Sequence, residues 1–327
     1  MSSDFKHIQI FILCKDRPEY FSQVVKSALS QIITKYSYEV IVSDNSITNS
    51  IYHLYRTEFS KFTNIRYVRR HPSLSALKHF EIAFSEADAD YVTFFHDDDL
   101  LFPHYASTMA DLLTKYNDVI SIACNAMEVN GDVTNIRRVS FPFLRMKFFC
   151  NKKSFLNQYL PGNGGLPPFS GYMFRLNSFS SNIFSNPDAG KHSDATILAK
   201  IIKFGRILWI PKILMCYRYH QQSDSSVENI KDRRLLLEFM YSSGINRFDL
   251  SVVFYRIIYI SNILNQKSRI YHKVKFYKYK RLFICKIIFR YYFWRMIFFR
   301  QLTRSLPFFN QILNHHIRDD LKKLSQY

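Results

Sequence analysis

The sequence predicts an α/β protein with a mainly parallel central sheet flanked by helices, followed by a basic and mostly α-helical C-terminal region. Three observations support this fold class. Short apolar runs rich in β-branched residues alternate with helical patterns in the first half of the chain. Hydrophobic residues make up 47% of the 327 residues and charged residues 22%, which suits a packed core and excludes a disordered chain. The basic residues concentrate near the C-terminus.

The first half of the chain is predicted to form strands joined by helices. Residues 7–13 and 38–43 have the pattern of buried strands. Apolar residues recur at helical spacing between them, with Asp16 as the expected N-cap and Pro18 in the first turn. Further strands are expected at 65–70, 91–95 and 119–129, and a helix at 75–86. Such alternation implies parallel strands with right-handed crossovers, and ligands bind at their carboxyl ends.

The second half is less regular. Residues 161–168 contain three Gly and three Pro and are predicted to form a loop. A helical pattern opens at Asp194 and ends before Gly205, and a strand-like run follows at 206–220. From about residue 227 onward the chain is predicted to be helical, basic and aromatic.

The charge is distributed unevenly. The chain has 45 Lys and Arg against 26 Asp and Glu, a formal net charge of +19. Residues 251–327 hold 16 of the basic residues and only two of the acids, so they carry +14, while the first 250 residues carry +5. The sequence therefore predicts a nearly balanced body with a strongly basic C-terminal region.

Four interpretations of the basic region are open: a membrane surface, nucleic acid, a solvated or packed helix face, and biased genome composition. Nothing in the body resembles a DNA-binding or RNA-binding module. On a helix, five basic residues gather on one arc, with Arg295 off it, and the rest of the surface is almost wholly apolar or aromatic, including Tyr291 and Trp294. The basic arc comprises Arg281, Lys286, Arg290, Arg300 and Arg304. This pattern favours an anionic membrane interface.

The cysteines and the apolar runs bound the location of the protein. Five Cys without C-x-x-C spacing indicate neither a disulfide framework nor a zinc site, and a reducing compartment is expected. No apolar stretch reaches 18 residues, and the first apolar run is too short for a signal peptide. We therefore expect neither a transmembrane helix nor secretion.

Acidic residues follow two of the predicted strands. Asp44 follows the strand at 38–43, and Asp97, Asp98 and Asp99 follow the strand at 91–95. Adjacent carboxylates repel one another unless a cation or hydrogen-bond donors neutralise them, and hard oxygen ligands suit Mg²⁺ or Mn²⁺. A helix cap and a solvated acidic turn are the alternatives. The position at a strand end favours a metal site that also binds phosphates.

Six segments occur in this order along the chain: FILCKDRPEYFSQVVKSALSQ (11–31), VIVSDNSITNS (40–50), YVTFFHDDDLLFP (91–103), SGYMFR (170–175), KHSDATILAKI (191–201) and CYRYHQQSDSS (216–226). Together they resemble the family-2 inverting glycosyltransferases with the GT-A fold. The resemblance covers about residues 7–226. It implies a GT-A domain at 1–226 and leaves 227–327 as the membrane-associating region.

The resemblance implies a nucleotide pocket for a UDP-sugar. Cys14 and Arg17 would line it, and Asp44 would accept hydrogen bonds from the uracil or ribose, unless it only caps the next helix. Lys78 stands where the family often has Asn or Arg-Asn. It would reach the diphosphate or be merely solvated. Asp97 would contact the ribose or support the metal.

The acidic triplet would be the D-x-D site of the family. Asp98 and Asp99 would hold Mn²⁺ or Mg²⁺, and His220 would supply a further ligand to the metal or the phosphates. His96 stands where the commonest pattern has an acid, so the sequence departs from the family there. Arg218 is a further candidate for phosphate contact.

Asp194 is the candidate general base, because inverting transfer needs one carboxylate to take the proton of the acceptor hydroxyl. His192 is the weaker alternative, and it is otherwise expected on the acceptor side. Gly171 and Tyr172 are expected beneath the acceptor, although Tyr172 equally suits the core.

The resemblance implies transfer of a single sugar from a UDP-sugar to a lipid-linked, polyprenyl diphosphate saccharide in O-antigen or capsule-type polysaccharide synthesis. The enzyme is expected in the cytoplasm, peripheral on the inner face of the cell membrane, without a nucleic-acid partner. Two alternatives are a non-catalytic membrane-bound scaffold and a metal-dependent nucleotidyltransferase. The latter would need a Gly-rich basic loop after the first strand, which residues 11–20 lack.

Overall fold

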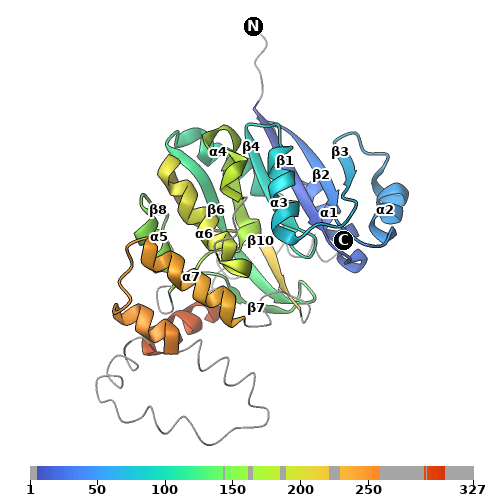
Figure 1. The fold of residues 1–327 in the computed structure, drawn as a ribbon. Helices are drawn as coiled ribbons and strands as arrows, with labels where there is room; N and C mark the ends of the chain where they lie inside the picture. The colour runs from blue at the N-terminus through green and yellow to red at the C-terminus, as the bar shows by residue number, and fades with distance from the viewer. Residues whose placement is uncertain are drawn as a thin grey trace, which may run out of the picture.

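The described residues form one ten-stranded mixed sheet with helices on both faces (Figure 1). The strand order is β3-β2-β1-β4-β9-β6-β10-β5, with β7 paired to β6 and β8 paired to β10. The computed structural model describes residues 6–142, 144–160, 165–184, 189–220, 229–257, 291 and 293–305.

The strands confirm the predicted sheet and add an antiparallel element at its centre. Neighbours β1–β2, β2–β3, β1–β4 and β6–β10 are parallel, whereas β9 runs antiparallel between β4 and β6. The parallel strands therefore all end at the edge of the sheet where β9 begins. The bounds are β1 (His7–Cys14), β2 (Ser37–Asp44), β3 (Ile65–Arg69), β4 (Tyr91–His96), β5 (Leu100–Leu101), β6 (Val119–Asn130), β7 (Ile136–Val139), β8 (Lys147–Phe149), β9 (Tyr172–Arg175) and β10 (Arg206–Tyr219).

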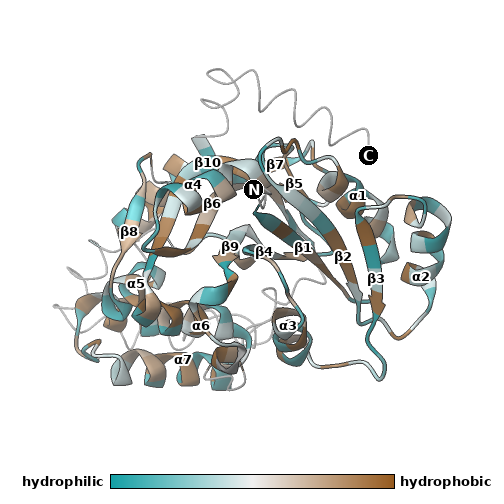
Figure 2. Cartoon of the chain, turned by 90° about the horizontal axis from the view of Figure 1, so that it is seen from above, coloured by the Kyte–Doolittle hydropathy of each residue, from teal (hydrophilic) through white to brown (hydrophobic). Residues whose placement is uncertain are grey.

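The helices divide the hydrophobic core into two layers. One layer lies under α1 and α4, and the other lies under α3, α5, α6 and α7, on the opposite face of the sheet (Figure 2). The bounds are α1 (Pro18–Leu29), α2 (Ser50–Leu54), α3 (Ala76–Ser85), α4 (Tyr105–Lys115), α5 (Lys152–Tyr159), α6 (Ser193–Ile201) and α7 (Ile230–Ser242), with further helix at 250–257 and 293–305. Both faces of the sheet are thus buried, which explains its nearly continuous apolar strands.

Two helix starts differ from the prediction. Asp16 is not the N-cap of α1: its φ is +52°, and its Oδ1 accepts a hydrogen bond of 2.8 Å from the Ile47 N–H. This left-handed backbone turns the chain before the helix, so Arg17 becomes the N-cap residue and Pro18 the first helical residue. Helix α6 begins at Ser193, one residue before the predicted start.

The predicted division at residue 226 is not marked by a break in the core. Leu236, Leu237 and Met240 of α7 are buried in the same cluster as residues of α6. The helical character expected after residue 227 is present in the described segments, and the two-part division stays a prediction. Within the described residues, no helix is both long enough and apolar enough to cross a membrane. Arg281, Lys286 and Arg290 of the predicted basic arc lie outside the described residues.

Candidate active site

The edge where the parallel strands end collects most of the predicted site residues. Cys14 and Asp44 end β1 and β2, the triplet Asp97–Asp99 follows β4, and His220 follows β10. Because β9 is antiparallel, its start lies at this same edge and brings Ser170 to the acidic turn. The topology therefore assembles one site from segments that are far apart in the sequence.

The first two acids of the turn pair with Arg17. The Asp97 Oδ2 accepts a hydrogen bond of 2.6 Å from the Lys15 backbone N–H, and Arg17 Nη2 lies 2.7 Å from Asp97 Oδ1. Arg17 Nη1 also forms an ion pair with Asp98 Oδ2. The His220 Nε2 lies 2.8 Å from that same Asp98 oxygen. Arg17, Asp97, Asp98 and His220 thus lie in one cluster of ionisable side chains, and their roles in binding a nucleotide or a metal stay predictions.

The third acid is held by two other strands. Asp99 is fully buried, and its Oδ2 accepts a hydrogen bond of 2.6 Å from Ser170 Oγ. Its Oδ1 accepts a hydrogen bond of 2.9 Å from the Arg218 backbone N–H. The guanidinium of Arg218 instead donates to Gln23 Oε1 at 2.8 Å and packs over the ring of Tyr20. A phosphate contact by Arg218 therefore stays a prediction.

The three carboxyl groups have different pKa values because their neighbours differ. Burial raises the pKa of Asp97 to about 7, and Arg17 opposes this shift. Burial also acts to raise the pKa of Asp98, but Arg17, His96 and His220 outweigh it, so the pKa is lowered. Burial and then the charge of Asp98 raise the pKa of Asp99. A cation at this turn would relieve the repulsion between Asp98 and Asp99.

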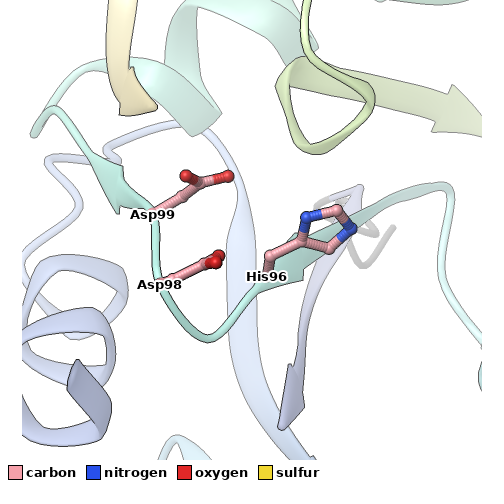
Figure 3. A group of neighbouring side chains, drawn as sticks. All are labelled: His96, Asp98 and Asp99. Atoms are coloured by element: carbon pink, nitrogen blue, oxygen red, sulfur yellow. The ribbon is translucent and has the colours of Figure 1, made fainter. Parts of the chain in front are cut away.

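His96, Asp98 and Asp99 can hold a divalent cation. One ligand atom from each of these residues lies within 4.8 Å of the others, and their side chains face a common space (Figure 3). Two carboxylates and an imidazole are a suitable donor set for a divalent metal, so the residues present fit the predicted cation. His96, which the sequence marks as a departure from the family pattern, completes this group. His220 touches Asp98, and its role as a ligand stays a prediction.

Two predicted nucleotide-binding residues are already engaged within the protein. Cys14 is fully buried, so only its backbone is available at the site, where its carbonyl accepts a hydrogen bond from the Asn45 N–H. Asp44 is also buried, and it accepts a hydrogen bond from the Tyr67 hydroxyl at 2.5 Å and pairs with Arg69. Asp44 does not cap α2, because that helix begins at Ser50.

Lys78 lies on the surface of α3. Its side chain is half exposed, and its Nζ lies 3.2 Å from Glu81 Oε2 one turn along the helix. This placement matches the solvated alternative that the sequence left open. Contact of Lys78 with a diphosphate stays a prediction.

The predicted base lies at the start of α6. Burial raises the pKa of Asp194 to about 6, while the Ala195 N–H donates a hydrogen bond of 2.7 Å to its Oδ1. Burial raises the pKa of Tyr172, and the charge of Asp194 adds to this shift. Tyr172 follows Ser170 by two residues. Ser170, just before β9, donates a hydrogen bond to Asp99 of the acidic turn.

The remaining acceptor-side residues are buried. Tyr172 lies wholly in the hydrophobic core, which matches the core role that the sequence allowed. A Cβ added to Gly171 would lie 3.1 Å from Met215 Sδ, so the absence of a side chain lets this segment pack closely. His192 Nδ1 lies 3.0 Å from the Tyr159 hydroxyl, and the imidazole is mostly covered. Acceptor contacts by these three residues stay predictions.

Sequence reasoning missed the residues that support the site. Asp99 accepts a hydrogen bond from Ser170, and Asp97 accepts one from the Lys15 N–H. Asp44 is held by Tyr67 and Arg69. Nothing in their local spacing distinguishes them, because their contacts arise from strand order. One signal was available. The resemblance placed residues 170–175 near the acceptor, but it did not indicate that Ser170 contacts Asp99.

Comparison with known proteins defines the family. The model of glycosyl transferase family 2 matches residues 9–179, more than half of the chain. The fold resembles that of S. aureus TarS 1-349 in complex with UDP-GlcNAc, with a TM-score of 0.57 and 13% identity over 92% of this chain and 91% of that chain. A second structure of S. aureus TarS 1-349 gives a TM-score of 0.54 with the same identity and coverage. No curated protein matches the chain by sequence.

Fold and family match together define a glycosyltransferase with a GT-A-like α/β fold. The chain belongs to glycosyl transferase family 2. This confirms the resemblance drawn from the six sequence segments, and it favours glycosyl transfer over nucleotidyl transfer.

Proposed function

We propose that this glycosyltransferase moves a single sugar from a UDP-sugar to an acceptor hydroxyl, with inversion at the anomeric carbon. The observation that carries the proposal is the group formed by His96, Asp98 and Asp99 at the strand ends of a family-2 fold. The choice of UDP is supported by the similar fold of TarS, whose structure is described in complex with UDP-GlcNAc.

In this reaction the acceptor oxygen bonds to the anomeric carbon while the bond from that carbon to the UDP oxygen breaks. Asp194 takes the proton of the acceptor hydroxyl, and its pKa of about 6 leaves it ionised at neutral pH and still basic enough for the task. When bound, Mn²⁺ or Mg²⁺ held by His96, Asp98 and Asp99 would supply positive charge that stabilises the departing UDP. Arg17 lies beside these acids and adds fixed positive charge there.

For the acceptor we propose a lipid-linked saccharide that carries a polyprenyl diphosphate, used in O-antigen or capsule-type polysaccharide synthesis. The protein would work on the cytoplasmic face of the cell membrane. Support comes from the +14 charge of residues 251–327 and from exposed aromatic side chains there, such as Trp294 at 62% and Phe298 at 62%.

Incubating the enzyme with a panel of UDP-sugars and measuring UDP release tests the proposal. We expect release from one UDP-sugar to exceed that from the others, to require Mn²⁺ or Mg²⁺, and to stop with a chelator. GDP-sugars and CMP-sugars serve as controls for the nucleotide. Release from none of the UDP-sugars, with or without metal, would contradict the proposal.

A further inference from the structure

A pocket lies where β8 and α5 meet the 293–305 helix, and none of the residues Asp97–Asp99 lines it. It has a volume of about 440 Å³ and is lined by residues of both segments. In Figure 1 the helix is coloured red and lies at the lower end of the described chain, below α5 and α7. The volume falls in the range of pockets that bind small molecules.

The lining of this pocket is basic. Lys147, Lys153 and Arg295 contribute to it, and the described residues that line it include no carboxylate. Burial, and then the nearby charge of Arg295, lowers the pKa of Lys147. Because cations brought close together repel one another, an anion between them would be stabilised by both.

A buried amide adds a hydrogen-bond donor to the same pocket. Gln158 of α5 is only 5% exposed, and its Oε1 accepts a hydrogen bond from Lys147 Nζ. Among the described residues, its Nε2 has no hydrogen-bond partner. A buried N–H without an acceptor is destabilising, so a ligand that offers oxygen atoms would be stabilised there.

The helix that supplies Arg295 also exposes large aromatic side chains. Trp294 and Phe298 are each 62% exposed and, four residues apart, lie on one face of the helix. Tyr291 is 59% exposed, while Phe299 turns toward the basic pocket and lines it. Exposed Trp and Tyr side chains are typical of residues at a membrane–water interface.

We propose that this pocket binds the phosphate group of an anionic membrane lipid. Arg295 and Lys147 would hold the phosphate oxygens, Gln158 Nε2 would donate to one of them, and Trp294 and Phe298 would enter the lipid surface beside them. The inference rests on the proposed membrane location and is independent of the sugar donor. The pocket would give the proposed membrane location a specific binding site in addition to the overall positive charge of residues 251–327.

Vesicle binding by the full chain tests the proposal. Binding to phosphatidylcholine vesicles is compared with binding to vesicles that also contain phosphatidic acid. The double variant Lys147→Gln/Arg295→Gln is compared with Lys61→Gln/Lys115→Gln, which removes the same charge from exposed positions outside both the pocket and the basic arc. We expect the pocket variant to lose about tenfold more affinity for phosphatidic acid vesicles than the control. Equal losses in the two variants would overturn the proposal.

A second variant guards against a loss of folding. Gln158→Glu keeps the size of the side chain and places a carboxylate next to Lys147, so the thermal unfolding temperature should hold while the preference for phosphatidic acid disappears. A preference that survives in this folded variant would overturn the proposal.

Two further measurements distinguish lipid phosphate from free phosphate, and membrane binding from sugar transfer. We expect inorganic phosphate to compete only weakly with vesicles. Strong binding of inorganic phosphate without vesicle binding would overturn the lipid assignment. UDP release from a soluble UDP-sugar should be the same in all these variants. If the wild-type protein releases no UDP, the proposed sugar transfer is contradicted, but the lipid-binding pocket is not.

Discussion

The acidic turn (Asp97–Asp99) and the basic pocket (Lys147, Lys153 and Arg295) differ in how firmly their charged side chains are fixed. At the turn, Asp97 and Asp99 are fully buried and are fixed by hydrogen bonds from other strands and loops. At the pocket, Lys153 is exposed and Arg295 lies on a separate helix. The difference suggests that the turn is organised before its ligand arrives, as chemistry requires. The pocket relies more on charge, as a reversible contact with a membrane would.

The largest effect should come from the predicted base. Asp194→Asn should lower kcat by about 10³- to 10⁴-fold, because an amide cannot accept the proton, while UDP binding is retained. UDP release and UDP affinity measure the two properties. Substantial remaining transfer in this variant, together with its loss in His192→Gln, would assign the base to His192.

The pH profile sharpens the same prediction. Below its pKa of about 6, Asp194 is protonated, so the wild-type rate should fall about tenfold per pH unit. Because this pKa is raised in the folded protein, the fold loses stability as the pH rises from about 4, the usual Asp pKa, to about 6, and the loss is complete above that. Asp194→Asn should therefore raise the unfolding temperature at pH 8 but not at pH 4. A rate that is flat from pH 5 to pH 8 would contradict the assignment.

The next largest effect is expected at the turn. Asp98→Asn should lower UDP release by about 10²- to 10³-fold and weaken Mn²⁺ binding, because it removes the carboxylate whose pKa is lowered. Asp111→Asn is the matched control, since Asp111 is an exposed acid on α4. Calorimetry with Mn²⁺ and an assay of UDP release provide the measurement. Equal activity of the two variants would place the metal elsewhere.

A smaller effect should follow from loss of support for Asp99. Ser170→Ala removes the 2.6 Å hydrogen bond to this buried carboxyl group, at a cost of about 1–3 kcal/mol. We expect Mn²⁺ affinity to fall roughly tenfold and the unfolding temperature to fall by a few degrees. Ser60→Ala, at an exposed position, should change neither. Unchanged metal affinity would show that Asp99 is not a ligand.

An effect of about the same size is expected from the exposed aromatic side chains Trp294 and Phe298. Trp294→Ala/Phe298→Ala should weaken vesicle binding by about tenfold, because each substitution removes apolar area that would contact the membrane. Phe62→Ala, which removes an exposed ring between α2 and β3, should leave vesicle binding unchanged. UDP release from a soluble UDP-sugar should be normal in both. A loss of vesicle binding in Phe62→Ala would indicate non-specific adsorption.

The sequence predicted the fold well because its signals are local. Strand and helix periodicities located β1, β2, β4 and β10, and the acids after β4 followed from position alone. The partners of these acids could not be predicted from the sequence, because Ser170 contacts Asp99 only as a result of the antiparallel pairing of β9 with β4. Burial also escaped the sequence: Cys14 and Asp44 end their strands as expected, but their side chains are enclosed.

The central claim is that the acidic turn binds a nucleotide together with a divalent cation. Thermal unfolding of the wild-type chain with UDP, GDP or CMP, each with and without Mn²⁺, tests it most directly. The account predicts that UDP raises the unfolding temperature only when Mn²⁺ is present, and that Asp98→Asn abolishes this increase while Asp111→Asn retains it. No metal-dependent stabilisation by any of the three nucleotides would contradict the account.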